Sequence, residues 1–381
     1  MYCGDKSKCC GIPDFAFPNQ QNQHPRLSHQ FLTKEPDTFL DDELVEGVSL
    51  VTDSQLVREM QIRLAKYVGA RIHEHTFFPA MWAVNLSMEN IHQLELNPPF
   101  IVTPKPEGPR FLLYVDSSGD IYLENMTQHF FRVDSDHAIQ MVSADGQSIA
   151  DTVLDGIVTR EKKSDGNKGK LTFVIRDGIR CGGQDLTKMN VFQRIAFVKE
   201  NVMKPRWDVK TTNENEAFDL DIVECLDTNL TDDYQAQEFG NESKYPLRSL
   251  VFFPRNKGYF GGTNKDVFQW TEDENYDSVF RLVIWQLSNE THKAELYAMD
   301  YQFNREVNFA PIAITEDLKE LHGRIVECRY VNGQWKLVRI RNDRPHPHSR
   351  RSVMNKLKMQ KSPLTRLNLR PLLEKSKGRS Q

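Results

Sequence analysis

Short apolar runs separated by turn residues fill the chain from residue 100 onward, and they constrain its fold more than any other feature of the sequence. Each run has the length of a strand and is rich in β-branched and aromatic residues. The runs span residues 100–103, 111–115, 121–123, 129–133, 152–154, 170–175, 249–253, 280–286, 294–297, 324–330 and 334–341. None approaches the roughly 20 apolar residues that a membrane-spanning helix needs. The sequence therefore predicts a strand-rich α+β protein that does not enter a membrane.

Helical periodicity is confined to a few segments. Apolar residues at helical spacing predict a helix over 55–67, the stretch 191–203 has a helical pattern, and the acidic stretch 213–241 is amphipathic enough to include another helix. Two segments between strands, Asp116–Asp120 and Asn332–Gly333, have the residues of hairpin turns. These turns indicate that many of the strands pair with their sequence neighbours.

The length of 381 residues, with 39% hydrophobic content, provides enough material for two packed domains. The strand pattern restarts after Gly258–Asn264, which predicts a domain boundary nearby. We expect a disordered extension at 1–39, a strand-rich α+β domain at 40–255, a hinge at 256–276, a small β-barrel of the oligonucleotide-binding (OB) type at 277–345, and a basic, flexible tail at 346–381.

Charge is distributed unevenly along the chain. From Pro345 to Gln381 ten Lys and Arg residues stand against one acid, a balance of +9 in a chain whose net charge is −4. A polybasic arm of this kind suits a polyanion, so the tail is a candidate RNA contact, with a nuclear-targeting or merely solvated tail as an equal alternative. Six cysteines in so long a chain are too few for a disulfide scaffold.

One short motif carries candidate chemistry. The segment Lys105-Pro106-Glu107-Gly108-Pro109-Arg110 fits the pattern K-x-[D/E]-G-x-R and lies between two predicted strands. Further segments follow it in a fixed order: Asp155-Gly156-Ile157, Phe173-Val174-Ile175-Arg176-Asp177, Leu250 to Pro254, Phe268-Gln269-Trp270, Asp277 to Leu282, and Arg341-Asn342-Asp343-Arg344. The order and spacing of the series are far more specific than any single motif within it.

This series resembles the covalent nucleotidyltransferases, and specifically the guanylyltransferase part of metazoan mRNA capping enzymes. The resemblance extends from about residue 40 to 345 and includes stretches outside the motifs, such as Leu44–Val48 and Ile325–Arg329. It implies a nucleotidyltransferase domain followed by an OB-type domain that closes over GTP. It also implies a lysine that attacks the α-phosphate of GTP, expels pyrophosphate with help from magnesium or manganese, and passes GMP to a diphosphate RNA 5′ end.

The resemblance assigns roles to residues of this sequence. Lys105 stands at the catalytic nucleophile, Gly108 at a tight turn and Arg110 at a ribose or phosphate contact. The residues that it assigns to nucleotide binding are Glu107, Gly108, Arg110, Asp155, Gly156, Phe173, Asp177, Trp270, Arg341, Asp343 and Arg344. No residue is assigned as a metal ligand. Aromatic residues in short strands, such as Trp270 and Phe280, have core packing as the competing interpretation.

The chain departs from the family pattern at functional positions. Ile157 stands where the family has a Glu that holds the ribose, Arg176 replaces an aromatic residue, and Arg248 replaces a carboxylate associated with the metal. Gln269 and Thr271 replace two lysines that face phosphates. Because one lost donor to a developing anion costs about two to three decades in rate, these replacements predict inefficient GMP transfer.

Two functions follow from the resemblance and its departures. In the first, the protein is a nuclear mRNA guanylyltransferase that uses GTP, with magnesium or manganese, and forms a lysyl-GMP intermediate. In the second, it is a weak or inactive pseudoenzyme that binds a cap, a guanine nucleotide or RNA. A polynucleotide ligase-like protein is a third and weaker alternative. The expected partners are an RNA 5′ end and, as a candidate, the transcription machinery.

Overall fold

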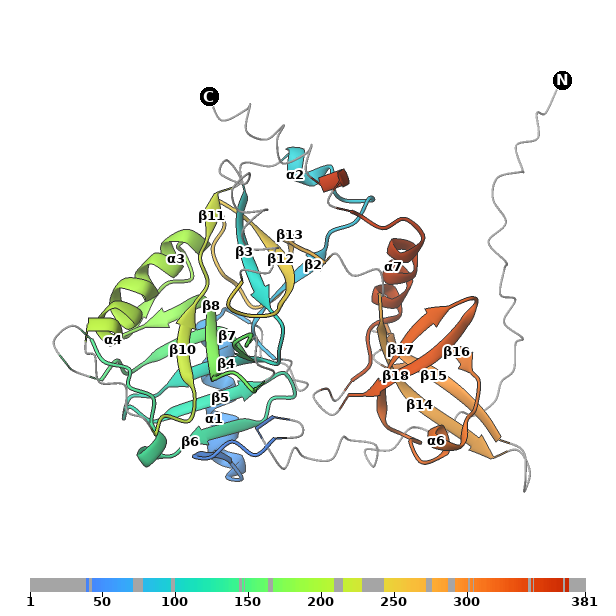
Figure 1. Cartoon of the computed structure of the whole chain (residues 1–381), viewed down its shortest axis with the longest axis horizontal. Helices are drawn as coiled ribbons and strands as arrows, with labels where there is room; N and C mark the ends of the chain where they lie inside the picture. Colours follow the sequence, from blue (N-terminus) through green and yellow to red (C-terminus); the bar gives the residue numbers. More distant parts are fainter. Residues whose placement is uncertain are drawn as a thin grey trace. The chain divides into compact units, whose positions relative to one another are not determined.

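The computed structural model describes residues 39–40, 43–70, 78–96, 100–143, 146, 148–163, 167–208, 215–227, 243–271, 276–286, 292–300, 302–303, 305–341, 344, 346–365 and 367–369. The elements of these segments form a mixed α+β domain and a smaller β-domain, as the sequence predicts (Figure 1). In none of these segments does a helix have the length and hydropathy of a membrane span.

Strands outnumber helices throughout. The first domain contains β1 (Val48–Leu50), α1 (Ser54–Tyr67), β2 (Met81–Asn85), α2 (Gln93–Leu96), β3 (Phe100–Pro106), β4 (Arg110–Val115), β5 (Ile121–Asn125), β6 (Phe130–Val133), η2 (Ser135–His137), β7 (Thr152–Arg160), β8 (Leu171–Cys181), β9 (Gln184–Asp185), α3 (Val191–Val198), η3 (Lys199–Met203), α4 (Lys204–Asp208), β10 (Asp219–Ile222), β11 (Leu226–Asp227), β12 (Leu247–Pro254) and β13 (Gly262–Trp270). The second contains β14 (Ser278–Gln286), β15 (His292–Asp300), β16 (Arg305–Ile312), α6 (Glu316–Lys319), β17 (Ile325–Val331), β18 (Gln334–Ile340) and α7 (Arg350–Lys361).

Two sheets build the first domain. The larger sheet has the order β1-β6-β5-β4-β7-β8-β10, with the short β9 also paired to β8, and its ladders are antiparallel except that between β8 and β10. The smaller sheet has the order β11-β3-β12-β13-β2, with only β13 and β2 parallel. The strand β3 contacts β7 and β8 of the larger sheet, so the two sheets meet at these strands.

Alternation along β3 divides its side chains between two cores. Ile101 belongs to the large core between the sheets, whereas Phe100 and Val102 belong to a second core that includes Phe252 and Trp270. Because side chains alternate along a strand, Thr103 and Lys105 share the face of Ile101. Lys105 therefore points toward the larger sheet.

Local sequence signals explain where the first helix and the hairpins form. The predicted helix over 55–67 is confirmed as α1, whose N-terminus is capped by Asp53 Oδ1, which accepts hydrogen bonds from the backbone N–H groups of Gln55 and Leu56 at 2.9 and 3.2 Å. Both predicted hairpin turns are confirmed, at Asp116–Asp120 between β4 and β5 and at Asn332–Gly333 between β17 and β18. Asn332 and Gly333 have φ of +51° and +81°, the left-handed values that a two-residue hairpin turn needs.

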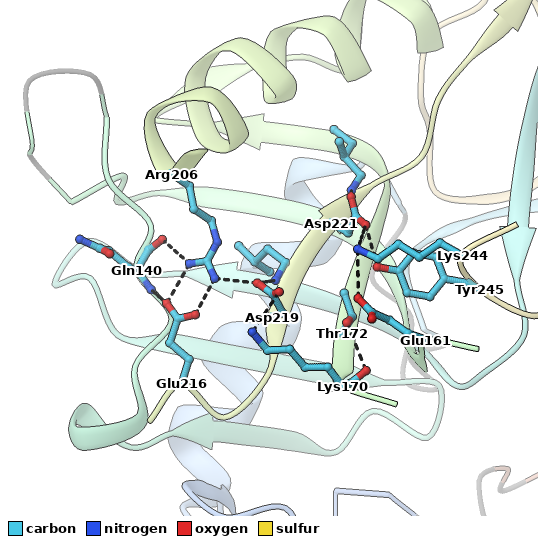
Figure 2. Close-up of polar contacts among 12 residues, drawn as sticks. Gln140, Glu161, Lys170, Thr172, Arg206, Glu216, Asp219, Asp221, Lys244 and Tyr245 are labelled. Atoms are coloured by element: carbon cyan, nitrogen blue, oxygen red, sulfur yellow. Dashed lines mark hydrogen bonds and ion pairs between the residues drawn. The ribbon is translucent and has the colours of Figure 1, made fainter. Parts of the chain in front are cut away.

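Hydrogen bonds and ion pairs join the edge strand β10 to α4 and to the segment before β12 (Figure 2). Arg206 of α4 donates to both carboxylate oxygens of Glu216 at 2.8 and 2.5 Å and to Asp219 of β10 at 2.8 Å. Farther along β10, Asp221 accepts from the Lys244 amine at 2.9 Å and from the Tyr245 hydroxyl at 2.7 Å. These polar groups satisfy one another, so the network joins β10 to α4 and to the residues before β12.

The second domain is a five-stranded sheet of order β16-β15-β14-β17-β18, in which all neighbours are antiparallel. The two end strands, β16 and β18, also contact each other, and α6 lies in the chain between β16 and β17. Phe280 and Trp335 pack edge to face inside it, with ring centroids 4.8 Å apart. The contact between the end strands closes the sheet into a small barrel, and its assignment to the OB type stays a prediction.

Several details differ from the sequence-based expectations. Phe39, expected in the disordered extension, is buried beside Phe111 in the large core, while residues 1–38 lie outside the described segments. The segment expected as a hinge contains β13, which pairs with β12 and β2 inside the first domain. In the stretch 213–241 the described residues form β10 and β11 rather than a helix.

The tail also differs from the expected flexible arm. Residues Arg350–Lys361 form α7, and Val353 is buried in the core of the barrel. Leu364 and Leu369 are buried in the second core, where the indole N–H of Trp270 donates to the Leu364 carbonyl oxygen at 2.9 Å. The helix and the buried leucines are hard to predict from the sequence because few apolar residues interrupt the basic stretch.

Candidate nucleotide-binding site

Lys105 lies on the inner face of β3, where the two sheets of the first domain meet. Its amine donates to Oε1 of Gln269 at 3.1 Å, and Ser249 faces it directly across the β3–β12 pair. Burial lowers the pKa of the Lys105 amine from its ordinary value near 10.5 to about 7, and the neighbouring guanidinium groups of Arg176, Arg110 and Arg248 add to this shift. An amine with this pKa has a large neutral, nucleophilic fraction near pH 7.

A tight turn connects Lys105 to the next strand. The backbone N–H of Glu107 donates to the Pro246 carbonyl oxygen at 2.8 Å, and the side chain of Glu107 is exposed. Gly108 has φ of +142°, and a Cβ atom there would lie 2.1 Å from the carbonyl oxygen of Val158. Only glycine fits this turn, which brings the chain from Lys105 on β3 to Arg110 on β4.

Arg110 and Asp155 form a buried, two-pronged ion pair. Nε and Nη2 of Arg110 donate to Oδ1 and Oδ2 of Asp155 at 2.8 and 2.5 Å, and Nη2 also donates to the Met81 carbonyl oxygen. The hydroxyl of Tyr259 donates to Oδ2 of Asp155 at 3.1 Å. Burial alone would raise the pKa of Asp155, but Arg110 and its other partners bring it below the ordinary value. Asp155 is therefore ionised and fully engaged.

Asp177 is engaged in the same way, on the helix side of β8. Its carboxylate accepts from Nε and Nη2 of Arg194 at 2.6 and 2.7 Å and from the backbone N–H of Gly178 at 2.9 Å. Arg194 is 1% exposed and lies over the ring of Tyr259. The pair fixes α3 to β8, so Asp177 has a structural role in this conformation.

Three residues assigned to nucleotide binding lie in packed regions. Phe173 is fully buried, and its ring lies so close to Gly156 that a Cβ atom on Gly156 would be 2.4 Å from it. Trp270 is 2% exposed and packs in the second core. Phe173 and Trp270 are thus packed in the two cores, and Gly156 provides the space for the Phe173 ring. The assignment of these three residues to nucleotide binding stays a prediction.

The C-terminal motif belongs to the barrel. Arg341 pairs with Glu327 of β17 at 3.1 Å, and Arg339 binds the same carboxylate at 2.6 Å. Arg344 is half-buried, and Asp343 lies outside the described residues. The assignment of these three residues to nucleotide binding stays a prediction.

Sequence patterns alone present Arg176 and Arg248 only as replacements of family residues. The structure places both close enough to Lys105 for their charges to lower its pKa, although Arg176 lies on β8 and Arg248 on β12. The sequence signal is that each arginine occupies a motif position where the family has a different residue. The pairing of β8 with β7, and of β12 with β3, brings the two arginines near Lys105.

The residues around Lys105 do not fit a magnesium or manganese ion of the kind that the family resemblance implies. Hard divalent cations are bound by carboxylate and carbonyl oxygens. In the two buried carboxylates of the site, Asp155 and Asp177, both oxygens accept hydrogen bonds from an arginine. Among the residues that the structure describes, no three His, Cys, Asp or Glu side chains gather as a metal-binding set.

Comparison with known proteins decides the family. The model of the mRNA capping enzyme catalytic domain matches residues 40–273, and that of the mRNA capping enzyme C-terminal domain matches residues 255–369. The chain belongs to the mRNA capping enzyme family. The second match of this capping-family protein reaches beyond α7, in agreement with the ordered structure of the first part of the tail.

Its relatives share modest identity with it. The mRNA-capping enzyme of Danio rerio is 25% identical over 88% of this chain and 56% of its own length, and that of Mus musculus is 23% identical over 90% and 57%. The capping-family chain thus spans little more than half the length of these relatives. A solved structure titled mycobacterial DNA ligase D complexed with ATP and MES matches 70% of this chain and 96% of its own at 13% identity, with a TM-score of 0.38.

Proposed function

We propose that this capping-family protein binds the phosphates of GTP or of an RNA 5′ end at Lys105, and that Lys105 forms a lysyl-GMP adduct only slowly. The observation that carries the proposal is the half-buried Lys105 amine, whose pKa is lowered to about 7 by desolvation and by neighbouring guanidinium groups. A neutral amine can attack phosphorus, and the surrounding cations can hold the phosphate oxygens. The same residues therefore support both binding and a residual covalent step.

The covalent step replaces one bond to the α-phosphorus of GTP with another. The neutral Lys105 nitrogen forms a bond to the α-phosphorus of GTP, the bond from that phosphorus to the bridging oxygen of pyrophosphate breaks, and the amine releases a proton to solvent. The product is a phosphoamide that can pass GMP to a diphosphate RNA 5′ end. Gln269, whose Oε1 accepts from Nζ of Lys105 at 3.1 Å, orients the amine.

The step is slow because supporting groups are missing. Ile157, which is fully buried in β7, provides no acceptor for a ribose hydroxyl. The carboxylates of Asp155 and Asp177 are committed to arginines. Each preorganised donor lost from such a transition state costs about two to three decades in rate.

Binding without transfer is the second candidate function, and the saturated carboxylates favour it. In that case the protein is a guanine-nucleotide, cap or RNA 5′-end module of the nucleus, and the transcription machinery is its candidate partner. The covalent nucleotide chemistry is then lost while the cationic site for phosphates is kept.

Incubation of the full chain with α-labelled GTP in magnesium, in manganese and in EDTA, followed by denaturing electrophoresis, tests the covalent step. A faint labelled band that disappears in Lys105→Ala supports slow transfer. A strong band, or a band that persists in Lys105→Ala, contradicts the proposal. When no band is seen, binding of GTP, cap analogue or 5′-triphosphate RNA, measured by calorimetry in parallel, supports the binding module, and failure to bind all three contradicts both functions.

A further inference from the structure

We propose that the Lys105 site holds phosphate groups directly through Arg176 and Arg248, without a divalent metal ion. The inference rests on the proposed function only in that the phosphates belong to a nucleotide or an RNA 5′ end. It assigns a binding role to two residues that are not among the residues assigned from the family resemblance.

Both arginines are the extra residues of β-bulges. Asp155 and Gly156 of β7 pair with Asp177 and Ile175 of β8, which leaves Arg176 unmatched. Bulges next to active sites commonly redirect a side chain out of the regular alternation of a strand. This bulge lies where β8 approaches β3 of the other sheet.

The second bulge lies on the opposite wall of the site. Pro106 and Lys105 of β3 pair with Leu247 and Ser249 of β12, so Arg248 is unmatched there. One bulge thus belongs to each sheet, and each presents a guanidinium group whose charge acts on the Lys105 amine. Arg176 is buried and Arg248 is exposed.

Buried polar atoms at the same place have no hydrogen-bond partner among the described residues. They are Nε of Arg176, Oγ of Ser249 and Oγ1 of Thr103. Ser249 lies opposite Lys105, and Thr103 lies two residues before it on the same face of β3. Buried polar groups in folded proteins are almost always hydrogen-bonded, so these donors indicate a missing ligand. Guanidinium and hydroxyl donors match phosphate oxygens.

The charge balance selects an anion over a metal ion. Arg110 neutralises Asp155, and Arg194 neutralises Asp177. Lys105 and two of the groups whose charges lower its pKa, Arg176 and Arg248, are all basic side chains. A polyphosphate gains from all three charges, whereas a divalent cation is repelled by them.

Calorimetric titration of the full chain in EDTA tests the inference, with GTP, inorganic tripolyphosphate and 5′-triphosphate RNA as ligands. We expect binding at least as tight in EDTA as in magnesium, and at least tenfold weaker binding by Arg248→Gln. Because Arg248 is exposed, this variant is expected to fold. Arg176→Gln should give the same loss, and its circular dichroism reports whether it is folded. Arg132→Gln, which removes an exposed arginine on β6, is the matched control and should leave binding unchanged.

A charge reversal sharpens the test. Arg248→Asp should abolish binding in EDTA and restore part of it in magnesium, because it supplies the carboxylate that the site lacks. Binding of the unmodified chain only in the presence of magnesium, or equal binding in EDTA by Arg248→Gln, would overturn the inference and leave the proposed function intact. Metal-free binding of tripolyphosphate with no preference for GTP or triphosphate RNA over ATP would support the inference and contradict the proposed function.

Discussion

Arg110 holds both carboxylate oxygens of Asp155, at 2.8 and 2.5 Å, across the ladder between β4 and β7. The two side chains come from motifs 45 residues apart, and both are nearly inaccessible to solvent. This pairing turns two residues that the family resemblance assigns to the ligand into a structural unit beneath Lys105.

Breaking the Arg110–Asp155 pair on one side should strongly destabilise the first domain. Asp155→Leu leaves a buried guanidinium unpaired, which should lower the free energy of unfolding by about 3–5 kcal/mol. The double variant Arg110→Met/Asp155→Leu removes both charges and should recover most of that loss. Urea unfolding of the two variants measures the difference, and a loss below about 1 kcal/mol in Asp155→Leu would contradict the role of the pair.

Stability should depend on pH through Lys105. Its pKa is about 7 in the folded chain, because of burial and neighbouring cations, and near 10.4 in the unfolded chain. Between these values the unfolded chain binds more protons, so this residue makes stability rise with pH. Lys105→Met should therefore be more stable than the parent below about pH 7, with the advantage shrinking toward pH 10. Unfolding of both proteins across this range measures the difference, and a constant difference would refute the lowered pKa.

Adding cations near Lys105 should increase GMP labelling if lost charge limits the covalent step. Gln269→Lys/Thr271→Lys places two ammonium groups on the segment that contacts the Lys105 amine. The labelled band should grow at least tenfold, since one donor to the transition state is worth about two decades. Gln269→Met removes the hydrogen bond without adding charge and serves as the control. Unchanged labelling in the double variant would show that another deficit dominates.

The basic tail should contribute RNA affinity through the exposed face of α7. Arg351 and Lys361 are exposed there, whereas Val353 is buried in the barrel. Arg351→Gln/Lys361→Gln should weaken binding to single-stranded RNA and reduce the logarithmic salt slope by about 1.4, or about 0.7 for each lost phosphate contact. Met354→Gln, an uncharged change on the same helix, should leave the slope unaltered. An identical slope in the charge variant would leave nuclear targeting as the role of these cations.

The network around Arg206 should matter for stability and leave phosphate binding unaffected. Arg206→Ala leaves Glu216, whose side chain is 2% exposed, without its partner and should cost about 3–5 kcal/mol. Folded Arg206→Ala should still bind tripolyphosphate like the parent protein, because Figure 2 places its contacts around β10. A large change in binding with little change in stability would contradict this separation.

Much of the fold can be predicted from the sequence, because most of its strands have a local pattern of apolar residues. The strands that form β4, β5 and β6 alternate or are continuously apolar, and Asn332–Gly333 has the residues that its hairpin turn requires. Periodicity does not predict the helix α7, because Val353 is its only fully buried residue and cations dominate the stretch.

The site is harder to predict than the fold. The order of the motifs identifies Lys105, and the resemblance places the tight turn at Gly108, but the partners of Asp155 and Asp177 depend on long-range pairing. A β-bulge changes the count of residues between two strands and leaves no mark on the period of either sequence. Arg176 therefore looks like a simple replacement until β7 and β8 are aligned.

At the two bulges, the residue that faces a ligand can change without a change in the pairing of the strands. Arg176 and Arg248 occupy positions that the ladders skip, so neither has a direct Cα partner whose side chain must match it. Evolution can exchange the residue at such a position for one of opposite charge while every neighbouring strand pair keeps its register. A scaffold with two such positions can change the side chains that hold a ligand while the register of its strands stays the same.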